Sequence, residues 1–291
     1  MKIGIIVESL RCPLETGIAR ARELGAEGIQ VYALSPGLDM LNDSPDKLKK
    51  LRETAENNGL VFSAVCSDLG GHGFSDPPGN PERLEKTRRI MEASRIFNTT
   101  VLTTHIGVVP ADRNSRLYAE VVATLRKAGE LAADHGMVLA IETGPESPEQ
   151  LKQFLLDVDH KGVGVNMDPA NLVMVQNADA AEAVRLLGKW IVHTHAKDGI
   201  HLRDCDPKRV YDAFAEGGFD QLVAETGELF REVELGKGQI NWTDYLNALR
   251  EVGYDGFLTI EREVGAHPDL DIAQAVHFLR GKIRETEHSI E

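Results

Sequence analysis

The fold is indicated most clearly by residues 137–197, MVLAIETGPESPEQLKQFLLDVDHKGVGVNMDPANLVMVQNADAAEAVRLLGKWIVHTHAK. Three short runs in it, rich in apolar and β-branched residues, are typical of buried strands: MVLAIE (137–142), GVGVNMD (162–168) and WIVHTHAK (190–197). Between them, residues 147–158 and 178–188 carry apolar residues at helical spacing. Strand and helix therefore alternate, which predicts parallel strands joined by crossover helices.

The same alternation extends over the rest of the chain. Five further runs are expected to form strands: IGIIVE (3–8), EGIQVYA (27–33), VFSAVC (61–66), VLTTH (101–105) and FLTIE (257–261). Eight strand-then-helix units in 291 residues predict an α/β fold, a single-domain (β/α)8 TIM barrel that spans residues 1–291. A doubly wound open sheet is the alternative, but no G-x-G-x-x-G turn follows any expected strand.

The longest break in the alternation follows the seventh expected strand. Residues 199–240 include VYDAFAEGGFDQLVAETGELF (210–230) and show no clear strand pattern. We expect an irregular, extended loop there that holds a short helix. Long loops at this end of a barrel commonly carry functional groups, so the segment is expected to form a lid or a substrate wall.

Composition narrows the classes of partner. The 32 basic and 46 acidic residues leave a net charge of −14, without any basic block. This balance argues against wrapping of nucleic acid and against binding to anionic membranes. No apolar run is long enough for a signal peptide or a membrane span, and three widely spaced cysteines cannot form a disulfide framework. We therefore expect a cytoplasmic protein with a small-molecule partner. The sequence is compatible with a monomer and with a homo-oligomer.

Polar residues stand at the ends of six expected strands, where an inert core would not need them. They are Glu8, His105, Glu142, Asp168, Glu261 and, on one face of the seventh strand, His193, His195 and Lys197. The carboxyl ends of barrel strands meet at one face, where barrel enzymes hold their active sites. Burying such groups is unfavourable unless they are paired or bind a metal ion. Their convergence predicts a cation site or a proton-transfer site.

A set of three carboxylates and one imidazole would offer mixed oxygen and nitrogen ligands. Such a set suits one divalent ion, Mn²⁺, Mg²⁺, Co²⁺ or Zn²⁺, and excludes thiophilic sites. Four protein ligands leave room for a bidentate substrate only if the ion accepts more than four ligands. That requirement favours Mn²⁺ as the cofactor over a closed tetrahedral zinc.

Four strings, each at a strand end, carry a resemblance to a known family: IETGPE (141–146), NMDPANL (166–172), HTHAKDG (193–199) and LTIEREVG (258–265). In this order they resemble the sugar-phosphate isomerase/epimerase family of xylose-isomerase-like barrels, over essentially the whole chain. The resemblance implies a metal site made of four residues: Glu142, Asp168, His195 and Glu261. It also implies that Glu142 and Glu261 are the catalytic carboxylates, which move a proton on opposite faces of the substrate.

Two positions depart from the family members that epimerise free ketoses. Asn171 stands where those enzymes carry His, and His201 stands where they carry Arg. An asparagine can hold a hydroxyl group but cannot carry a proton at neutral pH, and Asp-Pro-Ala-Asn is also ordinary turn chemistry. Both departures concern activity on free ketoses and leave the four implied metal ligands unchanged. The resemblance also extends to relatives that act on inososes or 3-keto-glycosides.

Six residues are expected to contact the substrate: His105, Asn171, Lys197, His193, His201 and Glu8. Several have an alternative role inside the protein. His105 would otherwise cap the end of its strand, and Lys197 would form an ion pair with Asp198 or Glu8. His193 would hydrogen-bond inside the barrel mouth and orient a metal ligand.

The residues and the resemblance together predict a divalent-metal-dependent sugar isomerase or epimerase. A carboxylate would remove the proton α to a carbonyl, and the metal would stabilise the enediolate. The substrate classes are keto-sugars, inososes and 3-keto-glycosides, phosphorylated or free. A lyase or dehydratase on the same substrates is the alternative, since elimination starts from the same intermediate. An apurinic-endonuclease-like phosphodiesterase would need a three-metal cluster and a basic face, and a non-catalytic sugar-binding barrel would keep the pocket without activity.

Overall fold

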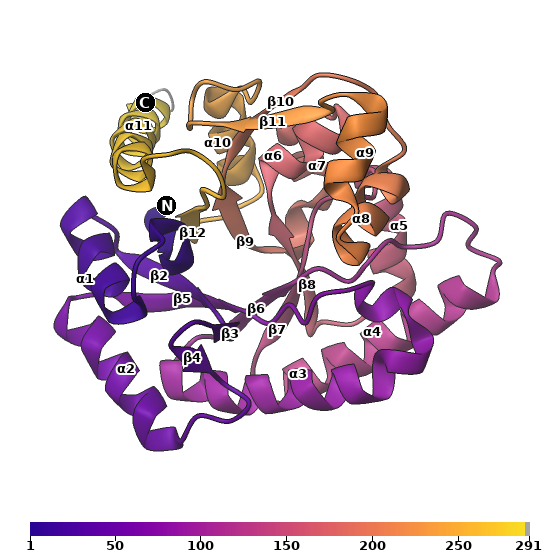
Figure 1. Ribbon diagram of the computed structural model, residues 1–291, viewed down its shortest axis with the longest axis horizontal. Coiled ribbons are helices and arrows are strands. Elements are labelled where there is room, and N and C mark those ends of the chain that lie inside the picture. Colours follow the sequence, from indigo (N-terminus) through magenta and orange to yellow (C-terminus); the bar gives the residue numbers. More distant parts are fainter. Residues whose placement is uncertain (289–291) are drawn as a thin grey trace.

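The computed structural model describes residues 1–288 as a closed barrel of eight parallel strands surrounded by helices (Figure 1). Around the barrel the strands follow the order β1, β12, β9, β8, β7, β6, β5, β2. Their bounds are β1 (Lys2–Ile6), β2 (Gly28–Tyr32), β5 (Val61–Cys66), β6 (Val101–Thr104), β7 (Val138–Glu142), β8 (Val163–Met167), β9 (Ile191–Ala196) and β12 (Phe257–Ile260). All eight expected strands are present, so the single (β/α)8 barrel is confirmed.

The connecting helices lie outside the barrel (Figure 1). Their bounds are α1 (Leu14–Leu24), α2 (Pro45–Asn57), α3 (Asn80–Ser94), α4 (Arg116–Asp134), α5 (Pro148–Val158), α7 (Ala180–Leu187), α10 (Trp242–Glu251) and α11 (Pro268–His288). Ser44, Ser115 and Ser147 each accept a hydrogen bond from a backbone N–H in the first turn of the helix that follows. Such caps satisfy amide groups that a helix leaves without partners. In the described part of the chain, no helix is both long and apolar enough to cross a membrane.

The pairing of the strands brings their polar residues to one end of the barrel. Glu142 of β7 lies opposite Asn166 of β8, and Thr259 of β12 lies opposite His195 of β9. After a shift in register between β8 and β9, Asn166 pairs with His193. The strand ends therefore present a polar layer next to a core of buried aliphatic side chains.

Smaller elements lie at the same end. β3 (Leu34–Ser35) and β4 (Leu38–Asp39) form an antiparallel pair after β2. Directly after β8 come α6 (Pro169–Asn171) and a π-helical turn (Leu172–Gln176). The Asp168 carboxylate accepts a hydrogen bond from the Asn171 backbone N–H and caps α6. The turn expected at Asp-Pro-Ala-Asn is therefore present, and it continues as helix.

The segment 199–240 is not the irregular loop expected from the sequence. It holds most of β10 (Asp198–His201), then α8 (Pro207–Glu216), α9 (Phe219–Thr226) and β11 (Phe230–Val233). β10 and β11 pair antiparallel, so the segment returns beside its own start (Figure 1). Gly217, with φ of 73°, ends α8 in the left-handed conformation and lets α9 follow at once. The expectation was wrong because elements this short leave no long periodic pattern.

Asp198 ties this segment to the barrel. Its buried carboxylate accepts hydrogen bonds of 2.9 Å from the backbone N–H groups of Gly199 and Gly236. It also accepts one of 2.9 Å from the indole N–H of Trp242, at the start of α10. One carboxylate thus holds both ends of the segment against the helix that follows it.

Replacing Asp198 with alanine should leave these three donors without their acceptor. Unsatisfied buried donors cost about 1–3 kcal/mol each, so we expect Asp198→Ala to lower the free energy of unfolding by about 3 kcal/mol or more. Urea unfolding followed by circular dichroism measures the change. Asp204→Ala removes an exposed acid of the same segment and should change stability by less than about 0.5 kcal/mol. If both variants are equally stable, Asp198 does not hold the segment.

Candidate metal centre and active site

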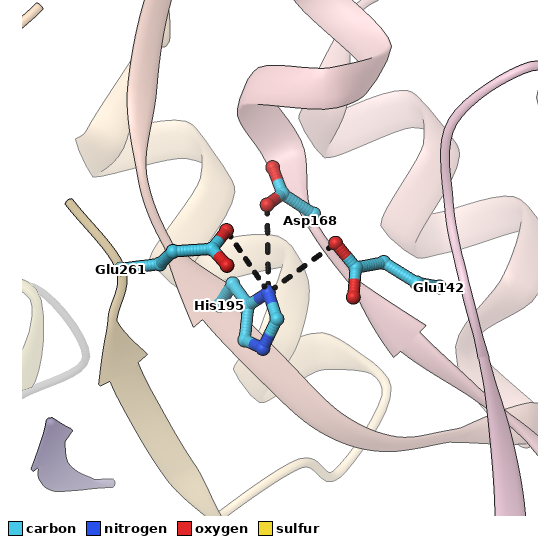
Figure 2. A group of neighbouring side chains, drawn as sticks. All are labelled: Glu142, Asp168, His195 and Glu261. Carbon is cyan, nitrogen blue, oxygen red and sulfur yellow. Dashed lines mark ion pairs between the residues drawn. The ribbon is translucent and has the colours of Figure 1, made fainter. Parts of the chain in front are cut away.

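Four side chains converge where the later strands of the barrel end. Glu142 closes β7, Asp168 follows β8, His195 lies in β9 and Glu261 follows β12. All four are buried, and one ligand atom from each lies within 4.8 Å of the others (Figure 2). The structure therefore brings together the four residues that the resemblance implied as metal ligands.

The distances fit a single ion. His195 Nδ1 lies 3.6 Å from Glu142 Oε1 (Figure 2). The same nitrogen lies 3.5 Å from Asp168 Oδ2 and 3.5 Å from Glu261 Oε2. Metal–ligand bonds of about 2.1 Å place ligand atoms about 3 Å apart at right angles and about 4.2 Å apart across the ion. Asp168 Oδ2 is also buried without a hydrogen-bond partner, a lack that a bound cation would remedy.

The charges of this group also favour a cation. Burial alone would lower the pKa of the His195 imidazole, but the carboxylates of Glu142 and Glu261 raise that pKa well above its ordinary value. Burial raises the pKa of the Asp168 carboxyl. Three carboxylates around one imidazole thus attract positive charge, and a divalent ion can take the place of the proton on Nδ1.

Polar residues behind His195 fix the orientation of its ring. Its Nε2 lies 3.3 Å from Gln30 Oε1 and 3.1 Å from Asn166 Nδ2, so Nδ1 faces the carboxylates. His193 Nε2 lies 2.9 Å from the same Gln30 oxygen. Burial, followed by the nearby charge of His195, lowers the pKa of His193 to about 3 and keeps its ring neutral. His193 is not among the residues that line the cavity, and its contacts with Gln30 and Thr259 suit the orienting role that was its alternative.

A second set of hydrogen bonds holds the carboxylates of Glu142 and Asp168. Asn171 Nδ2 donates to Glu142 Oε1 at 3.1 Å, and the Asn171 backbone N–H donates to Asp168 Oδ1 at 2.9 Å. Asn166 Nδ2 donates to Glu142 Oε2 at 3.2 Å. The Thr143 hydroxyl both donates to and accepts from the Asp168 backbone, at 2.8 Å each. These contacts position two of the candidate metal ligands before any substrate arrives.

Lys197 is bound by acids other than those expected. Its buried ammonium lies 3.1 Å from Glu261 Oε2, pairs with Glu263 and lies 3.9 Å from Glu232 Oε2. Burial alone would lower the pKa of Lys197, but these carboxylates raise it well above its ordinary value. These acids, and not Asp198 or Glu8, are its partners, so the alternative ion pair was wrong in its partner. Asp198 is the next residue of extended chain and points to the opposite side, and the Glu8 carboxylate accepts from the Tyr32 N–H.

His105 joins the site from the end of β6. Its Nδ1 lies 3.0 Å from Asp68 Oδ2, and its Nε2 lies 3.6 Å from Glu142 Oε1. Burial alone would lower the pKa of His105, but the charges of Glu142 and Asp68 raise it to about 10. A protonated imidazole therefore stands beside a metal ligand, where it can donate a hydrogen bond to an oxygen in the cavity.

A cavity of about 500 Å³ opens at the metal ligands. Six of the predicted site residues line it: Glu142, His195, Glu261, His105, Asn171 and Lys197. Besides His193, two predicted substrate contacts lie outside the lining, because each is turned to a partner within the protein. His201 contacts Met174 O and Asp204 Oδ1, at 2.9 Å each. Glu8 accepts a hydrogen bond of 3.0 Å from the Tyr32 backbone N–H.

Several residues of the cavity were not among those predicted. Gln30 and Tyr32 come from β2, and Asp68 follows β5. A glutamine inside an apolar strand is a readable signal, since a buried polar group needs a partner. Tyr211 and Phe214 come from α8. No local pattern marks them, because only the path of the chain outside the barrel brings α8 to the cavity.

The chain belongs to the family of xylose isomerase-like TIM barrels, whose model matches residues 18–282. A 2-epi-5-epi-valiolone 7-phosphate 2-epimerase of Actinoplanes sp. is 28% identical over 205 residues, 68% of this chain and 73% of that protein. An uncharacterized protein of Methanocaldococcus jannaschii is 26% identical over 238 residues, 76% of this chain and 70% of that protein. A crystal structure of a xylose isomerase domain protein from Planctomyces limnophilus shares the fold, with a TM-score of 0.77 at 24% identity over 93% of this chain and 92% of that one. Family and epimerase relative support a sugar isomerase or epimerase in general.

Removing a ligand should remove the ion. We expect Asp168→Ala and His195→Ala each to weaken Mn²⁺ binding by about 100-fold or more, because each deletes a buried ligand atom. Elemental analysis and isothermal titration measure the loss, while circular dichroism checks the fold. His201→Ala changes a histidine outside the cavity and should bind Mn²⁺ like the wild type. Full metal occupancy in Asp168→Ala or His195→Ala would remove that residue from the ligand set.

Glu146, four residues after a metal ligand, should make stability depend on pH. Burial raises the pKa of Glu146 to about 7, although its carboxylate accepts a hydrogen bond of 2.7 Å from the Val109 N–H. Its folded pKa lies above the ordinary value of 4.5, so its contribution to stability is present below pH 4.5 and is lost as the pH rises through 7. Glu146→Gln imitates the protonated acid, and its stability relative to wild type should rise by about 2 kcal/mol between pH 5 and pH 8.

Urea unfolding of both proteins at the two pH values measures this difference. Glu149→Gln removes an exposed acid at the start of α5 and serves as the control, with no such change expected. A difference between Glu146→Gln and wild type that stays constant with pH would mean that burial does not perturb Glu146.

Proposed function

We propose that this protein is a divalent-metal-dependent enzyme that isomerises or epimerises a carbohydrate by moving the proton α to a carbonyl group. One observation carries the proposal. Glu142 and Glu261 come from strands three places apart in the barrel, line one cavity and both lie within 3.6 Å of His195 Nδ1. Two acids at one cation centre suit removal of a proton from carbon and its return.

The ion would be held by Glu142, Asp168, His195 and Glu261. Bound there, it would polarise the substrate carbonyl and acidify the adjacent C–H, so that a carboxylate of modest basicity can take the proton. We propose Mn²⁺, because four protein ligands and a bidentate substrate need more than four positions on the ion.

The surrounding side chains give the two acids different tasks. Lys197 holds the Glu261 carboxylate at 3.1 Å, whereas Asn171 and the protonated His105 face Glu142. His105 can donate to a substrate oxygen while a carboxylate removes the proton from the neighbouring carbon. Return of the proton to the opposite face gives epimerisation, and its transfer to the adjacent carbon gives aldose–ketose isomerisation.

The phosphodiesterase alternative gains no support. In residues 1–288, one group of side chains is arranged to hold a metal ion, whereas that chemistry needs a three-metal cluster. The net charge of −14 also opposes a nucleic-acid substrate. A small carbohydrate is therefore the proposed partner. A cytoplasmic location and the assembly state stay predictions from the sequence.

Glu142→Gln and Glu261→Gln should each lower turnover by about two to four orders of magnitude, because the amide keeps the shape of the side chain but cannot take a proton. The assay is a screen of keto-sugars, inososes and 3-keto-glycosides with Mn²⁺ in D₂O. NMR follows deuterium uptake at the carbon α to the carbonyl, and loss of a leaving group would reveal elimination instead. In a two-base epimerase, one variant should still exchange the α-proton of one epimer without completing inversion.

Glu263→Gln is the matched control, since Glu263 lines the same cavity but lies outside the proposed ligand set. Its effect should stay at least tenfold smaller than that of the two ligand variants. Near-normal turnover in both Glu142→Gln and Glu261→Gln would contradict the two-carboxylate mechanism.

A further inference from the structure

An aromatic strip runs along one wall of the cavity. Tyr211 and Phe214 of α8 and Phe230 of β11 line the cavity, and Phe219 of α9 packs behind them. The rings of Phe214 and Phe219 are stacked with centroids 4.2 Å apart, and Phe230 lies 5.6 Å from Phe219. Tyr211 meets Phe214 edge-on at 6.2 Å. These four residues are called the aromatic strip below.

The strip starts at the metal centre and ends at the surface. A Cβ atom added to Gly144, two residues after Glu142, would lie 2.0 Å from the Tyr211 hydroxyl oxygen, so this hydroxyl touches the backbone beside a metal ligand. At the other end, the exposed fraction is 50% for Phe214 and 42% for Leu34, which also lines the cavity. Large apolar side chains left open at one cavity indicate a surface that binds an apolar group.

The basic side chains of the cavity are already paired with acids. The pairs are Lys197 with Glu261 and Glu263, His105 with Asp68 and Glu142, His72 with Asp212 and Glu216, and His195 with the acids of the metal centre. No arginine is among the described residues of the lining. The backbone N–H of Gly70, at the cavity, donates to Asp68 Oδ1 at 2.7 Å. A phosphate dianion needs cationic or amide donors that are not engaged by other anions.

We infer that the cavity takes an unphosphorylated glycoside whose apolar aglycone lies against the aromatic strip while the sugar ring faces the metal centre. The inference rests on the proposed function and names its substrate class, a keto-glycoside with an aryl or alkyl aglycone rather than a sugar phosphate. The Actinoplanes relative is named for a 7-phosphate, so the two proteins are expected to differ in this part of the cavity.

The contacts between the aglycone and the aromatic strip set the expected gain in affinity. An aromatic ring buried against Phe214 and Phe230 removes apolar surface from water and adds ring–ring contacts. Together these should strengthen binding of an aryl glycoside about tenfold over its methyl counterpart. A phosphate group placed among the carboxylates of the lining should weaken binding by at least as much.

The test measures binding without turnover. Isothermal titration of the Mn²⁺-loaded protein compares phenyl with methyl pyranosides of α-glucose, β-glucose and β-galactose, and compares glucose with glucose 6-phosphate and inorganic phosphate. At least one phenyl glycoside should bind about tenfold tighter than its methyl partner, and glucose 6-phosphate should bind no tighter than glucose. Phe214→Ala should reduce the phenyl-to-methyl ratio to below about three. Phe214→Leu, which keeps an apolar side chain against Phe219, gives an intermediate ratio if the alanine variant does not fold.

Leu156→Ala is the matched control, since Leu156 of α5 is 45% exposed and lies outside the cavity lining. It should keep the wild-type ratio. Equal binding of phenyl and methyl glycosides, an unchanged ratio in folded Phe214 variants, tighter binding of glucose 6-phosphate than of glucose, or no glycoside binding at all would overturn the inference. A phenyl preference that persists when no keto-sugar exchanges its α-proton would instead count against the proposed function.

Discussion

Three carboxylates meet one imidazole nitrogen inside this barrel, and such a group persists in a protein interior only when a cation balances it. Glu142, Asp168 and Glu261 lie within 3.6 Å of His195 Nδ1. Without a positive charge, their mutual repulsion and their burial would both oppose folding. An imidazolium proton can supply that charge, and a divalent ion can supply it together with Lewis acidity. The balance of charge therefore determines whether the buried carboxylates destabilise the fold, and it is also the basis of the proposed chemistry.

The rest of the barrel mouth serves this centre. Gln30 reaches His195 from β2, and Asn166 touches both His195 and Glu142, so strands on different sides of the barrel set the position of each ligand. Lys197 draws Glu261 toward Glu263 and Glu232, the last of which belongs to β11. The charge network thus links a metal ligand to the segment outside the barrel. Hydrogen bonds of this kind hold ligand atoms in place before the ion and substrate bind.

The cavity joins two chemical environments. At its base, carboxylates and imidazoles offer hydrogen-bond partners that suit hydroxyl and carbonyl groups. Along its wall Tyr211, Phe214 and Phe230 offer ring faces from elements that a minimal barrel does not need. Asp198 links the segment that carries the rings to the barrel. Its carboxylate accepts hydrogen bonds from Gly236 and Trp242 and so fixes where that segment leaves and rejoins the barrel. The proposed chemistry and the proposed recognition therefore lie on different parts of the chain, as is common in barrels.

The barrel, and the group of residues proposed to hold a metal ion, could both be predicted from the sequence. Apolar runs alternating with helical patterns predict parallel strands, and parallel strands in a barrel bring their carboxyl ends together, so Glu142, Asp168 and Glu261 could be placed at one point without a structure. Period two predicts which face of a strand a residue occupies but not its partner. The sequence therefore placed Lys197 at the barrel mouth without its pairs to Glu261 and Glu263, and it offered the contact of His193 inside the mouth only as an alternative. The two helices and the strand pair after β9, and the position of Tyr211 and Phe214 of α8 at the cavity, became visible only in the folded protein. The physical reason is that these short elements owe their position to long-range packing and to the buried Asp198, which leave no periodic signal in the residues themselves.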